Sequence, residues 1–182
     1  MPAVRGGPLV AGVMVVAIVA TAVPANAADT TVTFTATAGS LSITAAASAT
    51  LSGGTTTPGG TVSGALGTVT VTDARGSAAG WVASVYSTTG FTSATNPTIV
   101  NSGTTYTPGA TTATSTPGTP TITAGTAGPL GASSGSPLTA YTYANATAGG
   151  NTVSWNPSLA VVIPITTKSG AVYSGTVSHQ VV

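Results

Sequence analysis

This 182-residue sequence has very few charged residues: three are lysine or arginine, two are acidic, and none is glutamate. Charged residues make up 3% of the chain, against roughly 25% in an average soluble domain. Nucleic-acid binding needs clustered lysine and arginine to neutralise phosphates, and these residues cannot form such a cluster. The composition therefore excludes a nucleic-acid-binding protein and argues against electrostatic attachment to an anionic surface.

Cysteine is absent, so no disulfide framework can stabilise the fold and stability must come from core burial and hydrogen bonds. The single histidine, His179, has no acidic residue near it in sequence, whereas a metal site needs three or four ligands. Glycoside hydrolysis requires two facing carboxyl groups, and the only acidic residues are Asp29 and Asp73. We therefore predict no catalytic residues, no metal, no cofactor and no enzymatic activity.

Threonine, serine, glycine, alanine and valine dominate what is present. Threonine and valine fit the pleated surface of a sheet, while glycine and proline punctuate turns. Hydrophobic residues reach 42% and the net charge is +1, a balance unlike that of disordered chains. The composition predicts a folded chain of many short strands.

The N-terminus follows the pattern of a cleaved secretory signal peptide. Arg5 precedes an apolar run over residues 9–23, and Ala25-Asn26-Ala27 supplies the small-x-small cleavage signature. The run is shorter than the roughly 20 residues of a membrane helix and ends at Pro24. We predict a signal peptide over residues 1–27, and a secreted mature chain over 28–182 with no membrane anchor after cleavage.

Alternating patterns and turn residues predict nine strands in the mature chain. The expected strands cover residues 31–38, 41–45, 49–51, 64–72, 80–86, 138–145, 151–155, 159–165 and 172–181. A stretch rich in glycine, proline and threonine over residues 101–135 interrupts this series. It forms either a long surface excursion or short edge strands around Tyr106 and Ile122, since proline disfavours a central strand. The fold class predicted is all-β: one antiparallel β-sandwich domain with this excursion.

The strongest local pattern follows the strand at 64–72. Asp73 and Arg75 project to the same side of an extended segment and can pair, while Gly76 and Gly80 permit a tight reversal. Trp81 can then bury its indole beside the turn. We interpret this group as a structural clasp that closes a hairpin, with ligand binding as the alternative.

The run VTVTDARGSAAGWVASV over residues 69–85 resembles the WxL-type surface domains of Gram-positive bacteria. The end of the chain, VIPITTKSGAVYSGTVSHQVV, is similar to the terminal strands of their actinobacterial relatives, and residues 151–157 are placed like the second tryptophan motif. The resemblance implies non-covalent attachment to peptidoglycan outside the cell, with Trp81 and Trp155 as binding residues. Trp81-Val82-Ala83 and Trp155-Asn156-Pro157 stand where the family has Trp-x-Leu.

These features predict a secreted, non-enzymatic protein of the cell surface whose partner is cell-wall peptidoglycan or another surface protein. Two alternatives stay open. Neutral, threonine-rich edges lack the charges that usually block edge-to-edge pairing, so the chain could self-associate as a structural subunit of a coat, fibre or pilus-like layer. Its tyrosines and tryptophans could instead form a carbohydrate-binding, adhesive module.

Overall fold

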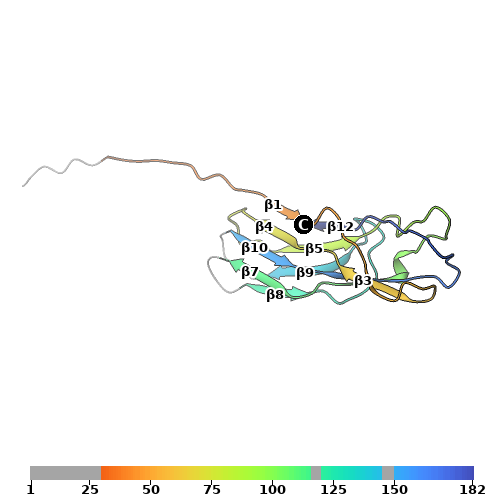
Figure 1. The fold of residues 1–182 in the computed structure, drawn as a ribbon. Coiled ribbons are helices and arrows are strands. Elements are labelled where there is room, and N and C mark those ends of the chain that lie inside the picture. Colours follow the sequence, from red (N-terminus) through yellow and green to blue (C-terminus); the bar gives the residue numbers. More distant parts are fainter. Residues whose placement is uncertain (1–29, 116–119, 145–149) are drawn as a thin grey trace, which may run out of the picture. The chain divides into compact units, whose positions relative to one another are not determined.

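The computed structural model describes residues 30–115, 120–144 and 150–182. The chain divides into two compact units, Met1–Thr35 and Ala36–Val182, and every described strand belongs to the second (Figure 1). The predicted signal peptide over residues 1–27 lies outside the described residues. No helix in the described ranges is long and apolar enough to cross a bilayer.

The described part of the second unit contains twelve strands and one short 3-10 helix. They are β1 (Leu41–Thr44), β2 (Gly53–Gly54), β3 (Thr61–Ala65), β4 (Val69–Asp73), β5 (Trp81–Tyr86), η1 (Asn101–Gly103), β6 (Thr104–Thr107), β7 (Thr111–Ser115), β8 (Thr121–Ala124), β9 (Leu138–Ala144), β10 (Asn151–Trp155), β11 (Ser158–Val162) and β12 (Ser178–Val181).

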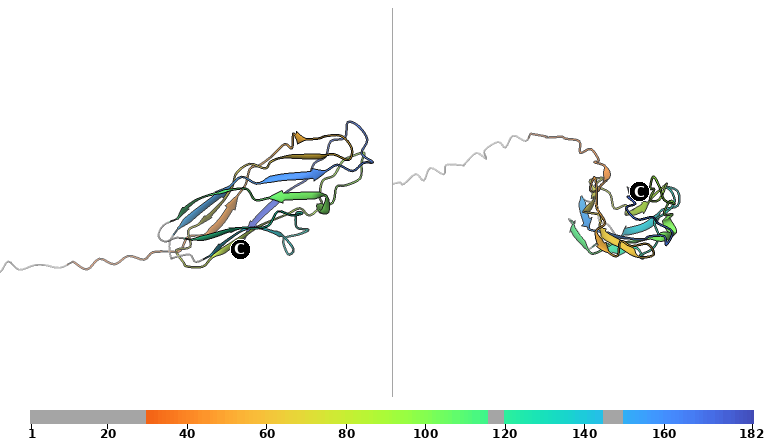
Figure 2. Two further views of the ribbon diagram at one scale, coloured as in Figure 1. Left: turned by 90° about the horizontal axis from the view of Figure 1, so that it is seen from below. Right: turned by 45° about the vertical axis from the view of Figure 1, so that its right-hand side comes forward.

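The strands form three antiparallel sheets of four strands each. Sheet A has the order β1-β4-β10-β7, sheet B the order β2-β3-β11-β6, and sheet C the order β12-β5-β9-β8. The layer formed by sheets A and B lies opposite sheet C (Figure 2). The predicted all-β, antiparallel sandwich is confirmed.

Sheets A and B are two halves of one creased layer. Each strand of sheet B is the neighbour along the chain of the strand that holds the same place in sheet A: β2 with β1, β3 with β4, β11 with β10 and β6 with β7. The crease falls at Gly67 and Gly109, both with positive φ, and at the fully buried Pro157. These residues interrupt the hydrogen-bond ladders, because a glycine with positive φ leaves the strand conformation and proline donates no backbone hydrogen bond. The layer continues beyond them as the second sheet.

The crease explains one departure from the predicted strand map. The expected strand over residues 64–72 is divided into β3 and β4 by Gly67, whose φ is 86°. The expected strand over 172–181 shortens to β12, and no strand forms over 49–51. Alternation of side chains shows which segments could form a strand, but a strand also needs a neighbouring backbone to pair with.

The expected strand over residues 31–38 is not formed either. This segment is exposed and pairs with no described strand, although its threonines alternate with Val32, Phe34 and alanines. Periodicity specifies which side chains would share a face, whereas pairing requires a free sheet edge in register.

Residues 101–135, for which the sequence left open a surface excursion or short edge strands, contain short edge strands. Tyr106 lies on β6 and Ile122 on β8, and β6, β7 and β8 are the terminal strands of sheets B, A and C. Edge positions suit this composition because one side of each strand needs no ladder partner.

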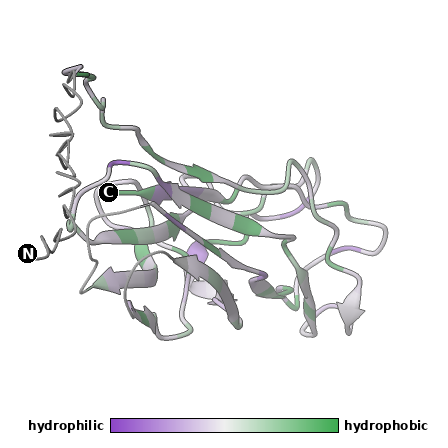
Figure 3. Ribbon diagram, turned by 90° about the vertical axis from the view of Figure 1, so that its left-hand side faces the viewer, coloured by the Kyte–Doolittle hydropathy of each residue, from purple (hydrophilic) through white to green (hydrophobic). Residues whose placement is uncertain are grey.

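The core lies between the two layers. Buried residues alternate with more exposed ones along β4, β6, β10 and β11, and Figure 3 shows hydrophobic bands recurring along the strands. The largest of these buried side chains are Tyr106, Leu159, Val69, Val71, Val85 and Val153. Burying a side chain of this size stabilises the fold by about 1.5–3 kcal/mol each, which replaces the missing disulfides.

Candidate functional site

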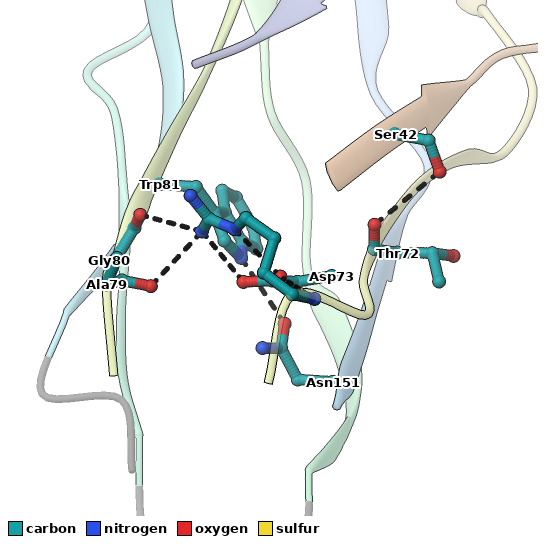
Figure 4. Close-up of polar contacts among 8 residues, drawn as sticks. Ser42, Thr72, Asp73, Ala79, Gly80, Trp81 and Asn151 are labelled. Atoms are coloured by element: carbon teal, nitrogen blue, oxygen red, sulfur yellow. Dashed lines mark hydrogen bonds and ion pairs between the residues drawn. The ribbon is translucent and has the colours of Figure 1, made fainter. Parts of the chain in front are cut away.

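The Asp73 carboxylate is the centre of the predicted clasp. Asp73 ends β4, where it lies opposite Leu41 on one side and Asn151 on the other, and it is 1% exposed. Arg75 donates from Nε to Oδ1 at 2.9 Å and from Nη2 to Oδ2 at 2.8 Å, and its backbone N–H donates to Oδ1 at 3.0 Å (Figure 4). Both carboxylate oxygens are therefore engaged by one residue.

The same guanidinium closes the turn between β4 and β5. Nη2 of Arg75 also donates to the carbonyls of Ala79 at 3.1 Å and Gly80 at 3.0 Å. Gly76 has a φ of 67°, and a Cβ on Gly80 would lie 2.3 Å from the Tyr143 carbonyl oxygen. Asp73 and Arg75 therefore pair as the sequence predicts, and a side chain would be strained at Gly76 by its φ and at Gly80 by the Tyr143 carbonyl.

The clasp also sets the charge state of Asp73. The hydrogen bonds from Arg75 lower the pKa of this carboxyl, burial opposes that shift, and the Asn151 side chain adds to the lowering. Asp73 is therefore ionised and paired at neutral pH, which leaves it unsuited to act as a general base.

Trp81 packs directly behind the clasp. Its indole is 2% exposed, stacks on Tyr143 with ring centroids 5.2 Å apart, and donates from Nε1 to Oδ1 of Asn151 at 3.3 Å. Because Asn151 lies opposite Asp73 in sheet A, this hydrogen bond joins the two layers of the sandwich. The indole serves packing here.

Trp155 occupies a similar place on sheet A. It is also 2% exposed, its ring lies 5.0 Å from that of Tyr141, and its Nε1 donates to the Tyr106 hydroxyl at 3.2 Å. Trp81 and Trp155, which the sequence offers as binding residues, are both buried here, and their N–H groups are bonded within the fold. Tyr141 and Tyr143 are buried as well, so the four rings complete the core.

A histidine continues this buried polar chain. Nε2 of His179 lies 3.2 Å from the Tyr106 hydroxyl. Burial lowers the pKa of His179 to about 4 and raises that of Tyr106 to about 12. Nδ1 of His179 is buried and has no hydrogen-bond partner among the described residues. The histidine is therefore neutral at physiological pH, and no group of three His, Cys, Asp or Glu residues in the described ranges could hold a metal ion beside it.

The outer face of sheet A carries a feature that our sequence reasoning missed. Strands β1, β4, β10 and β7 each present two hydroxyl residues in an [S/T]-x-[S/T] pattern, and the strand register aligns them across the sheet. One row is Ser42, Thr72, Thr152 and Thr114, and the other is Thr44, Thr70, Ser154 and Thr112. We call these eight residues the hydroxyl face.

The hydroxyl face is uncharged and open to solvent. Its residues are exposed or half-buried, and hydrogen bonds along it join Thr70 to Ser154 at 2.9 Å and Ser42 Oγ to the Thr72 carbonyl at 3.5 Å. Strands lie about 4.8 Å apart and side chains on one face recur about every 6.7 Å along a strand, so the hydroxyls form a regular grid. The repeated [S/T]-x-[S/T] motif is visible in sequence, but its alignment depends on the strand order.

No protein-family model, curated protein or solved structure matches the chain.

Proposed function

We propose that the protein is a secreted, non-enzymatic component of the bacterial surface that attaches non-covalently to cell-wall glycan through the hydroxyl face. The observation that carries this proposal is the register of eight serine and threonine side chains in two rows across sheet A. Each hydroxyl both donates and accepts hydrogen bonds, as the hydroxyl and amide groups of a wall polysaccharide do.

A neutral grid suits a repeating, weakly charged polymer. The three charged residues in the described ranges are Asp73, Arg75 and Lys168, and the first two neutralise each other in the clasp. Attachment by this protein must then depend on shape, hydrogen bonds and threonine methyl contacts, which salt screens little. A grid spaced at about 4.8 Å and 6.7 Å can engage several sugars of one strand at once.

The resemblance to WxL-type domains implies the same class of partner. The proposal keeps that partner and moves the contact from the two buried tryptophans to the hydroxyl face. In this account the clasp and the indoles act as supports, because they fix Asp73 and Asn151 at one end of sheet A and so hold its strands in register.

Sedimentation with isolated Gram-positive cell walls tests this proposal. The paired variant Thr72→Val and Thr152→Val removes two hydroxyls that face each other across strands while keeping side-chain shape. We expect saturable binding that persists at high salt, and a loss of about tenfold in affinity for this variant, since each hydrogen bond contributes about 0.5–1.5 kcal/mol.

The matched control is Thr123→Val and Thr142→Val. This pair also lies opposite across neighbouring strands, β8 and β9, with one residue exposed and one half-buried, but on sheet C. The control should bind walls like the unmodified protein. Equal losses in both variants, or no saturable binding at all, would contradict a role for the hydroxyl face.

Assembly into a surface layer or fibre is a second candidate function, and the sheet edges favour it. None of the edge strands β1, β2, β6, β7, β8 and β12 contains Asp, Glu, Lys or Arg, so the usual barrier to edge-to-edge pairing is missing. Sedimentation velocity and electron microscopy at rising concentration would show ordered oligomers, and a monomer at every concentration would contradict assembly.

A further inference from the structure

A groove with both apolar and polar lining residues opens on the side of the sandwich where β1 lies beside β12. Two adjoining hollows of about 200 and 430 Å³ share Ala49, Leu51, Phe91 and Gly175. Residues 45–51 form one rim and residues 171–177 the other. We call this feature the open groove.

Part of the groove's rim has unused backbone groups. Residues 45–51 form no strand and make no backbone hydrogen bond to another described residue. The strands β1 and β12, which each end their sheet, lie side by side at one end of the groove and leave residues 45–51 as its unpaired rim. Unpaired N–H and C=O groups along a groove that also has apolar lining residues are a template for one more strand.

Residues 31–38 have the composition and length that such a strand needs. This segment, TVTFTATA, alternates threonine with apolar residues, contains no charge or proline, and pairs with no described strand. Val32 is 79% exposed and Phe34 is 90% exposed. Its eight residues match the seven-residue rim 45–51 in length.

Two backbone hydrogen bonds just after the segment oppose a reversal of the chain toward the groove of the same molecule. Gly39 donates its N–H to the Ala74 carbonyl at 3.0 Å, and Ala74 donates to the Ser40 carbonyl at 2.9 Å. These two bonds hold the chain extended as it enters β1, whereas self-docking would require a reversal at these same residues. A second copy of the chain meets no such obstacle.

We propose that residues 31–38 of one molecule dock as an added strand in the open groove of a second molecule, with Val32 and Phe34 facing the groove floor. Repetition of this contact links molecules head to tail, because each carries one segment and one groove. The proposal deepens the assembly function proposed above and is independent of wall binding.

Two variants, one double and one single, each disrupt only one side of this contact. Val32→Ser with Phe34→Ser removes the apolar side chains of the segment but leaves the groove intact. Ala47→Arg places a long cation on the exposed rim of the groove but leaves the segment intact. Circular dichroism and thermal unfolding establish that both variants fold, since neither alters a core residue.

Sedimentation velocity of the purified protein then tests the contact. We expect concentration-dependent oligomers for the unmodified protein, monomers for each variant alone, and a one-to-one dimer when the two variants are mixed. A synthetic peptide of residues 30–39 should bind the Val32→Ser, Phe34→Ser variant, and a Phe34→Ser peptide should bind more than about tenfold more weakly.

Three results would overturn the docking proposal. Oligomers that persist in both variants would leave assembly standing but place its contact elsewhere. An unmodified protein that stays monomeric at all concentrations, with no peptide binding, would remove both docking and assembly. Peptide binding that Ala47→Arg does not weaken would show that the open groove is not the receptor.

Discussion

At the scale of single residues, two ionisable side chains, Asp73 and His179, are held by hydrogen bonds to other side chains. Asp73 and Arg75 form one ion pair, and His179 ends a chain of hydrogen-bonding groups that runs through Tyr106 to Trp155. In a chain with so little charge, these contacts account for most of the expected dependence of stability on pH.

We predict that the free energy of unfolding falls between pH 6.5 and pH 4 because of His179. Burial lowers its pKa to about 4, against 6.5 for an ordinary histidine. Between these values the unfolded chain binds a proton and the folded chain does not, so the folded state loses stability as pH falls. The loss is up to about 3 kcal/mol and is complete near pH 4.

Urea unfolding at pH 7, 5.5 and 4.5 measures this effect, and His179→Gln is its control. The sequence contains no other histidine, so the variant should lose the pH dependence in this window. Asp73 acts in a separate window, because its lowered pKa gives stability that is present above pH 3.8 and lost as pH falls further. An unchanged slope in His179→Gln would refute the assignment.

At the scale of elements, the accuracy of the sequence-based predictions depended on the kind of signal. The bounds of β10 were predicted correctly, and the clasp was found because Asp73, Arg75, Gly76 and Gly80 lie within one turn. Local chemistry of this kind can be read from adjacent residues.

Features that depend on pairing between distant segments were missed. Nothing within residues 31–38 shows that no sheet edge receives them, and Gly67 gave no sign that a crease divides one layer into sheets A and B. The hydroxyl face was missed for the same reason, since its four motifs meet only in the order β1-β4-β10-β7. Strand order is a tertiary property.

Trp81 connects three strands: it lies on β5, stacks on Tyr143 of β9 and donates a hydrogen bond to Asn151 of β10. We therefore predict that its loss destabilises the packing of these strands. Trp81→Ala should lower the free energy of unfolding by about 3–5 kcal/mol, the usual cost of a large cavity in a core. Trp81→Phe keeps a ring beside Tyr143 and should cost less. Chemical denaturation measures both; an alanine variant with unchanged stability would show that the indole is not a core residue.

At the scale of the whole molecule, function in this account is divided between two surfaces. The outer face of sheet A offers a neutral hydroxyl grid, and the open groove is the proposed site for a strand of another copy. Wall attachment and self-assembly therefore use different residues, so that either can be removed without the other.

The central claim is that the hydroxyl face contacts wall glycan. The most direct measurement is an NMR titration of the threonine methyl groups with soluble peptidoglycan fragments. We predict saturable shifts at Thr70, Thr72 and Thr152 on sheet A and none at Thr123 and Thr142 on sheet C. Shifts confined to sheet C, or no shifts at saturating fragment, would contradict the claim.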